Sequence, residues 1–208
     1  MSAPRLYLIT DRHQTGGRPL LEVVAAALRG GVDAVQLREK DLNARELLAL
    51  ARSLLPLCRQ HGARLLINDR IDVALAAEAD GVHLPASSFA GADARRLLRR
   101  RLLGVSAHTI AEVAEAAGAG ADFVVLGPIY TTPSKASYGP PLGLAILAEA
   151  VRRVPIPVLA LGGITREHVS AVCGQGAAGI AVIRAICAAP EPTAAAAELR
   201  AELLRALQ

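Results

Sequence analysis

Residues 157–183 read PVLALGGITREHVSAVCGQGAAGIAVI, and this stretch indicates how the chain folds. A short apolar run, Pro157–Leu161, leads into a Gly-Gly pair. A helical pattern follows at Arg166–Cys173, and a second apolar run covers Gly179–Ile183. Short apolar runs that alternate with helical stretches are typical of βα units around a parallel sheet.

The same unit recurs along all 208 residues. The predicted strands are Arg5–Thr10, Ala34–Arg38, Arg64–Asn68, Gly81–Leu84, Leu103–Ala107, Phe123–Gly127, Pro157–Leu161 and Gly179–Ile183. The predicted helices are Pro19–Arg29, Ala44–His61, Asp72–Ala77, Asp93–Arg100, Thr109–Ala117, Leu144–Arg153, Arg166–Cys173 and Thr193–Leu207. Eight units favour a single (β/α)8 TIM barrel over residues 1–208. The alternative is an open doubly wound sheet of the flavodoxin or Rossmann type, but no Gly-rich dinucleotide fingerprint follows the first strand.

The composition narrows the class of protein. Hydrophobic residues make up 52% of the chain, yet there is no Trp and there are only two Phe and three Tyr, so we expect a core of Ala, Leu, Val and Ile. The three cysteines, Cys58, Cys173 and Cys187, lack metal or redox spacing and are expected to be buried, reduced thiols. No apolar run reaches the roughly 20 residues of a membrane span, and residues 1–10 do not resemble a signal peptide, which indicates a cytoplasmic protein with no membrane partner.

The net charge of +4 does not indicate a nucleic-acid partner. Much of the excess positive charge lies in one cluster of arginines, and this cluster lacks the interleaved aromatic residues that stack on bases. Its members are Arg95, Arg96, Arg99, Arg100 and Arg101. We interpret this cluster as a solvated face.

In a TIM barrel the chemistry lies just after the C-terminal end of each strand. Gln36, Arg38 and Lys40 alternate at the C-terminal end of the second strand, so they are expected to point to one side and form an anion clamp. The alternative is a surface salt-bridge cluster with Glu39 and Asp41.

The third and fifth predicted strands end in further polar groups. Asn68 and Asp69 close the third strand, and Asp69 is either an oxygen ligand for Mg²⁺ or the cap of the next helix. Ser106 and His108 close the fifth strand. His108 is the histidine best placed for proton transfer near neutral pH, or a structural hydrogen-bonding residue at the start of a helix.

Two loops complete the expected site. Residues 127–135, GPIYTTPSK, are rich in turn residues and hydroxyls and contain a Lys, which is typical of a substrate loop. Gly162 and Gly163 follow the seventh strand, and Ile183 and Arg184 end the eighth. In barrels these two positions commonly form a phosphate site from backbone N–H groups and a helix N-terminus.

Taken together, these motifs resemble the thiamine phosphate synthase family across nearly the whole chain. The matching stretches are VQLREK (35–40), LLINDR (65–70), ADGVHL (79–84), GVSAHT (104–109), GPIYTTPSK (127–135), LGGIT (161–165) and GAAGIAVI (176–183). In that family an aminopyrimidine diphosphate loses pyrophosphate, and the ring nitrogen of a thiazole phosphate captures the resulting carbocation. Mg²⁺ and cationic side chains neutralise the leaving pyrophosphate.

The resemblance implies a role for each matched residue. The expected contacts to the pyrimidine diphosphate are Gln36, Arg38, Lys40 and Asn68, and those to the pyrophosphate are Ser106 and Lys135. Asp69 is the expected Mg²⁺ ligand, and the expected catalytic residues are Lys135, Ser106 and His108. The thiazole phosphate is assigned to Thr132, Ser134, Gly162, Gly163, Ile183 and Arg184.

The chain departs from the synthase pattern after the fourth strand. Ser88 stands where synthases carry a second metal-binding carboxylate, and the run Pro85–Phe89 resembles the thiazole tautomerase branch of the family. Pro128, in contrast, stands where synthases have it and where tautomerases usually have a His. The alternatives to a synthase are a metal-free tautomerase acting on carboxythiazole phosphate and a non-catalytic barrel that binds phosphate ligands. The oligomeric state stays open, and a homo-oligomer is compatible with the sequence.

Overall fold

The computed structural model describes residues 3–132 and 140–208 and contains a closed parallel barrel. Within these residues the strands are β1 (Leu6–Ile9), β2 (Ala34–Leu37), β3 (Arg64–Asn68), β4 (Gly81–Leu84), β5 (Leu102–Ala107), β6 (Phe123–Leu126), β7 (Val158–Leu161) and β8 (Gly179–Val182). They pair in chain order, and β1 closes the ring by pairing with β8. This confirms the predicted TIM barrel and rules out the open sheet.

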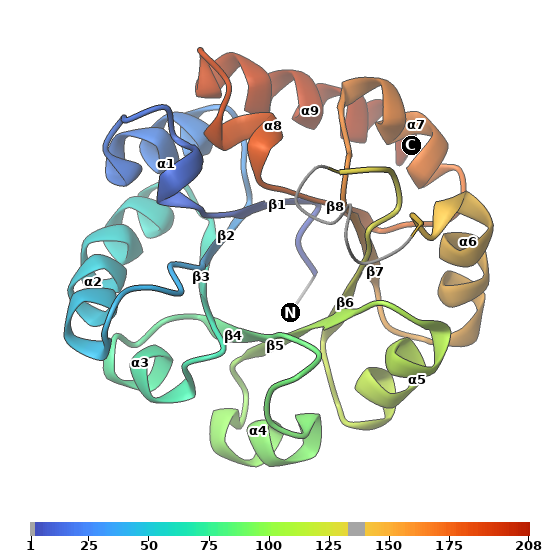
Figure 1. The fold of residues 1–208 in the computed structure, drawn as a ribbon, viewed down its shortest axis with the longest axis horizontal. Coiled ribbons are helices and arrows are strands. Elements are labelled where there is room, and N and C mark those ends of the chain that lie inside the picture. Colours follow the sequence, from blue (N-terminus) through green and yellow to red (C-terminus); the bar gives the residue numbers. More distant parts are fainter. Residues whose placement is uncertain (1–2, 133–139) are drawn as a thin grey trace.

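The helices form a ring around the strands (Figure 1). They are α1 (Leu20–Arg29), α2 (Ala44–Gln60), α3 (Ile71–Ala76), α4 (Gly91–Leu98), α5 (Ile110–Gly118), α6 (Gly143–Arg153), α7 (Arg166–Cys173), α8 (Arg184–Cys187) and α9 (Pro192–Ala206), with a 3-10 helix η1 (Arg12–Gln14) after β1. Local signals fix several starts: at α2, for example, Asn43 caps the backbone N–H of Glu46, whose carboxylate caps that of Asn43.

Three differences from the predicted elements have physical causes. Helix α4 ends at Leu98 because Arg99 adopts a left-handed φ of +53°, which an α-helix cannot continue. The 3-10 helix η1 and the four-residue helix α8 were not predicted, since neither is long enough to show a helical period. The remaining bounds differ from prediction by a few residues at most.

The strands are buried on both faces, as an apolar parallel strand must be when helices cover one face and the barrel interior the other. One set of strand side chains packs under the helices, and the alternate set fills the barrel. The interior set includes Tyr7, Leu66, Leu102, Phe123 and Leu159. Two aromatic side chains, Tyr7 and Phe123, therefore lie inside the barrel, and most of the remaining core in the described residues is aliphatic, as the composition predicted.

Gly104 on β5 makes room for the interior aromatic rings. A Cβ at this position would lie 2.5 Å from the Phe123 ring and 2.7 Å from Nδ1 of His83, well inside van der Waals contact. Any side chain here would therefore displace the centre of the barrel.

The cysteines and the arginine cluster can both be located in the structure. All three cysteines are free and buried, and burial raises the pKa of Cys58 to about 12 and of Cys187 to about 11. In the arginine cluster, Arg95 bonds to Asp122 and to the Gly120 carbonyl. The cluster precedes β5 and so lies at the end of the barrel opposite the strand C-termini. In the described part of the chain, no helix combines the length and apolarity needed to cross a bilayer.

Candidate active site

The C-terminal ends of the strands meet at one mouth, because every neighbouring pair is parallel. Side chains alternate along a strand, so Gln36 follows interior Ala34, Asn68 follows interior Leu66, and Ser106 shares the interior face of Leu102. The barrel thus brings the predicted positions Gln36, Asn68 and Ser106 to the same mouth.

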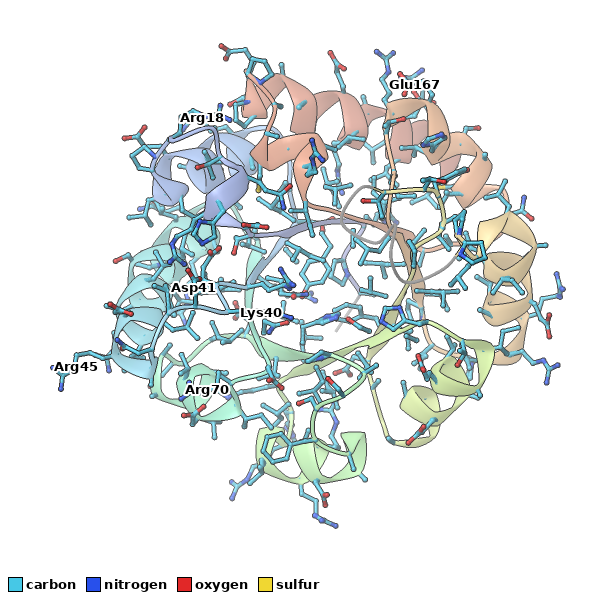
Figure 2. The ribbon with its side chains drawn as sticks, in the orientation of Figure 1. Arg18, Lys40, Asp41, Arg45, Arg70 and Glu167 are labelled. Atoms are coloured by element: carbon cyan, nitrogen blue, oxygen red, sulfur yellow. The ribbon has the colours of Figure 1, made fainter. Side chains whose placement is uncertain are left out.

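The two cations predicted to form an anion clamp lie just beyond β2. Arg38 is half-buried and Lys40 is exposed, and within the described residues neither side chain has an ion pair. Lys40 lies on the barrel side of this connection, whereas Arg45 projects outward from α2 (Figure 2). The alternative prediction, ion pairs from Arg38 and Lys40 to Glu39 and Asp41, is therefore wrong.

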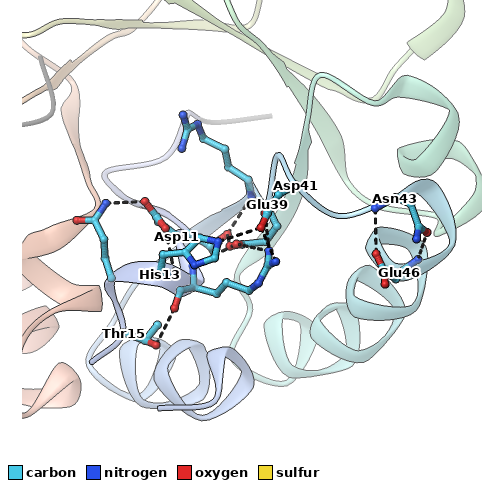
Figure 3. Close-up of polar contacts among 11 residues, drawn as sticks. Asp11, His13, Thr15, Glu39, Asp41, Asn43 and Glu46 are labelled. Atoms are coloured by element: carbon cyan, nitrogen blue, oxygen red, sulfur yellow. Dashed lines mark hydrogen bonds and ion pairs between the residues drawn. The ribbon is translucent and has the colours of Figure 1, made fainter. Parts of the chain in front are cut away.

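Glu39 and Asp41 instead bind residues that follow β1 (Figure 3). The Glu39 carboxylate is buried and accepts hydrogen bonds from the Thr10 hydroxyl at 2.6 Å and from the Arg12 backbone N–H at 3.1 Å. The Arg12 guanidinium contacts Glu39 at 3.3 Å and binds both oxygens of Asp41, at 2.7 and 2.6 Å.

The same cluster holds the Arg38 backbone, whose N–H donates to the Thr10 hydroxyl at 2.9 Å. Hydrogen bonds from His13 and Arg12 hold the pKa of Asp41 at about 2. Arg12 therefore binds both carboxylates that could otherwise pair with Arg38 and Lys40. Sequence reasoning missed Arg12, because it lies 27 residues from Glu39 and has no motif of its own.

Asp69 does not cap the following helix. Helix α3 begins after Arg70, without a side-chain cap, and Asp69 has a left-handed φ of +65°. Its carboxylate accepts a short hydrogen bond from Ser88 on the β4–α4 connection. The two residues considered for metal binding are thus in direct contact, as a carboxylate and a hydroxyl. Across residues 3–132 and 140–208, no cluster of three or more His, Cys, Asp or Glu side chains could hold a metal ion.

A buried histidine that sequence reasoning missed lies inside the barrel. His83 on β4 is 1% exposed, its Nε2 lies 2.9 Å from Ser106 Oγ, and its Nδ1 lies 3.4 Å from the Tyr7 hydroxyl. Gln36 Nε2 donates to that hydroxyl at 3.2 Å. The alternation of side chains along β4 could have found His83. Its neighbours Val82 and Leu84 pack outward under the helices, so His83 must point into the barrel.

His108 makes the structural hydrogen bonds that the sequence allowed at the start of α5. Its Nδ1–H donates to the Gly127 carbonyl at 2.5 Å, and its backbone N–H donates to Glu112 at 2.6 Å. In the neutral ring this leaves Nε2 as the nitrogen with a lone pair. His108 also lines the main cavity of the mouth, so a ring held by structural bonds faces the site.

That cavity has a volume of about 590 Å³ and lies over the ends of β6, β7 and β8. Its lining includes five of the predicted thiazole-phosphate residues: Thr132, Gly162, Gly163, Ile183 and Arg184. Ser134 and Lys135, the remaining predicted residues of the substrate loop, lie outside the described residues.

The glycines at the cavity wall have backbone conformations that other residues avoid. Gly162 has φ +97° and Gly163 φ +64°, and a Cβ on Gly163 would lie 2.6 Å from the Thr131 carbonyl. His168 Nδ1 lies 3.0 Å from the Gly163 carbonyl, and its ring stacks on Tyr130 at a centroid distance of 3.9 Å. Packing thus fixes a tight turn whose backbone an anion can approach closely.

The Arg12 cluster predicts a defined stability effect. Arg12→Ala leaves the buried Glu39 carboxylate without its cationic partner, so the free energy of unfolding should fall by about 1–3 kcal/mol in urea titrations. Arg45→Ala is the matched control, because this exposed arginine makes no side-chain ion pair within the described residues, and it should change the value by at most about 0.5 kcal/mol. Equal effects of the two substitutions would contradict the assigned role of Arg12.

Comparison with known proteins places these features in a family. The sequence profile of the family described as thiamine monophosphate synthase matches residues 6–186. A Geobacter sulfurreducens protein provisionally named a thiamine-phosphate synthase is 56% identical, over 95% of this chain and 93% of its own length. A thiamine-phosphate synthase of a Roseiflexus species is 47% identical, over 97% of this chain and 86% of its own length.

Solved structures agree with the sequence relatives. The thiamine phosphate pyrophosphorylase from Pyrococcus furiosus has a TM-score of 0.91 and 35% identity, covering 98% of this chain and 97% of its own. A 3-hexulose-6-phosphate synthase at 21% identity and a TM-score of 0.71 shares the fold alone. By profile, sequence and structure, the chain belongs to the thiamine monophosphate synthase family.

Proposed function

We propose that the chain is a thiamine phosphate synthase, a transferase of thiamine biosynthesis. It joins 4-amino-2-methyl-5-pyrimidinylmethyl diphosphate to hydroxyethylthiazole phosphate and releases pyrophosphate. The named relatives with 47% and 35% identity carry this activity in their names, which supports the assignment. Both substrates are phosphorylated small molecules. The proposal also places the enzyme in the cytoplasm.

The observation that supports the proposal is that two separate regions with groups suited to anions lie at one mouth. Arg38 and Lys40 stand after β2 without ion pairs in the described part of the chain, and the glycine-lined cavity stands over β6 to β8. A synthase must hold a diphosphate and a monophosphate at once. A tautomerase acting on one monophosphate needs only the cavity.

Each region has a proposed chemical role. Arg38 and Lys40 stabilise negative charge on the diphosphate as the bond to the pyrimidine methylene breaks, and Ser106 donates a hydrogen bond to the same group. The turn at Gly162 and Gly163, the backbone at Ile183, and Arg184 bind the thiazole phosphate. Held in this way, the thiazole nitrogen can reach the electrophilic carbon before water does.

Asp69 and Ser88 would hold Mg²⁺ if the ion binds. Their direct contact supplies two oxygen donors, the ligand type that Mg²⁺ prefers, and the ion commonly completes its shell with substrate phosphate oxygens and water. When bound, Mg²⁺ would offset charge on the diphosphate. Because Asp69 is the only charged donor of this pair, metal affinity should depend on the diphosphate being present.

An assay tests the reaction directly. Purified protein with both substrates and Mg²⁺ should release pyrophosphate and form thiamine phosphate. Arg38→Ala or Lys40→Ala should raise KM for the diphosphate roughly 10- to 100-fold, because each removes a charge-assisted bond, with little change in KM for the thiazole phosphate. If the protein instead isomerises carboxythiazole phosphate without a metal, it is a tautomerase. If it binds these ligands but catalyses neither reaction, it is a non-catalytic barrel.

The phosphate turn predicts a separate effect on the other substrate. Gly163→Ala should raise KM for the thiazole phosphate roughly tenfold or more, because the added Cβ clashes with the Thr131 carbonyl and shifts the turn. Gly62→Ala is the matched control, since Gly62 has nearly the same φ of +65° but has open space around its Cβ position. If both variants raise this KM equally, the turn does not bind the phosphate.

The Ser88 position predicts a gain of metal affinity. Ser88→Asp adds a carboxylate beside Asp69 and should tighten Mg²⁺ binding on the order of tenfold or more, measured by calorimetry with inorganic pyrophosphate present. Ser87→Asp adds the same charge at an exposed neighbouring position and is the control. Equal tightening by both variants would show a general charge effect and would remove Asp69 and Ser88 from the metal site.

A further inference from the structure

Four polar side chains form a hydrogen-bonded chain through the barrel. The distances are 3.2 Å from Gln36 Nε2 to the Tyr7 hydroxyl, 3.4 Å from that hydroxyl to His83 Nδ1, and 2.9 Å from His83 Nε2 to Ser106 Oγ. Gln36, Tyr7 and His83 are buried, and Ser106 is half-buried at the mouth. The chain therefore links the interior of the barrel to a site residue.

The donors and acceptors in this chain have one consistent direction, beginning at Gln36. An amide nitrogen can only donate, so the Tyr7 oxygen accepts from Gln36. Burial raises the pKa of Tyr7, which keeps its single hydroxyl hydrogen in place. Of the two side chains that bond to the Tyr7 hydroxyl in the described residues, only His83, through Nδ1, can accept this hydrogen.

His83 continues the same direction. Its side-chain partners in the described structure are the hydroxyls of Tyr7 and Ser106, and no carboxylate is among them to balance an imidazolium. Burial also lowers the pKa of His83 to about 3, so the ring is neutral and carries one hydrogen. Because Nδ1 accepts from Tyr7, that hydrogen resides on Nε2 and is donated to Ser106 Oγ.

We propose that Tyr7 and His83 are positioning residues that fix the Ser106 hydroxyl as a hydrogen-bond donor toward an anionic oxygen at the mouth. Ser106 accepts from His83 and so keeps its own hydrogen for a ligand. With the opposite tautomer of His83, Ser106 would donate into the ring and turn a lone pair toward the anion. The identity of this anion, the substrate diphosphate, rests on the proposed function; the orientation of the hydroxyl does not.

The packing of the aromatic rings allows the Tyr7 hydroxyl to be removed without loss of the ring contacts. The Tyr7 ring contacts Phe123 edge-on at a centroid distance of 5.6 Å, and the His83 ring lies 6.0 Å from Phe123. Tyr7→Phe keeps these ring contacts and removes only the hydroxyl. Phe123→Leu is the matched control, because it disturbs the same cluster without removing a polar group of the chain.

The imidazole tautomer of the ligand-free protein provides the first test. Nitrogen-15 NMR of the histidine rings near pH 7 should show His83 as the Nε2–H tautomer in the wild-type protein and in Phe123→Leu. Tyr7→Phe should shift it measurably toward Nδ1–H. A wild-type His83 that is Nδ1–H or doubly protonated overturns the proposal, whether or not the protein turns over any substrate.

Kinetics then test the link to Ser106 through a double-mutant cycle. Tyr7→Phe should lower kcat/KM on the order of tenfold in the wild-type background and have almost no effect in the Ser106→Ala background. His83→Gln, which can present an amide N–H to Ser106, should retain more activity than His83→Leu. Equal effects of Tyr7→Phe in both backgrounds would show that Tyr7 supports the structure without acting through Ser106.

Discussion

Closure of the parallel barrel is the constraint from which the rest of the site follows. Closure sends every second strand residue into a packed interior, so an interior polar group must find a partner there or stand at the mouth. Tyr7, His83 and Gln36 satisfy one another in this interior, and no buried side-chain nitrogen or oxygen in the described residues lacks a hydrogen-bond partner. The network that stabilises the barrel centre thus ends at the mouth, on Ser106.

Ion pairing keeps the acidic side chains near the mouth away from Arg38 and Lys40. Glu39 and Asp41 flank Lys40 in sequence and would offset the charges of Arg38 and Lys40 if they turned toward these side chains. Arg12 holds both carboxylates on the side of β1, and Glu39 is buried there. The local positive charge of Arg38 and Lys40 therefore depends on a residue that touches no predicted ligand.

Much of the fold and part of the site could be predicted from sequence, for different physical reasons. Strand number and closure followed from apolar periodicity and the count of eight units, and Gly162 and Gly163 could be placed at the mouth because they follow the seventh strand. Arg12 and His83 could not be found in this way. Their roles come from partners 27 and 23 residues away, and such pairings exist only once the barrel closes.

The central claim is that one mouth binds two separate anions, and simultaneous binding measures this most directly. Inorganic pyrophosphate should be titrated calorimetrically into the protein with Mg²⁺, alone and after saturation with hydroxyethylthiazole phosphate. The account predicts one pyrophosphate per chain in both titrations, with affinity lowered by Arg38→Ala and unaffected by Gly163→Ala. Mutual exclusion of the two ligands, with both affinities lowered by Gly163→Ala, would show a single phosphate site and contradict the account.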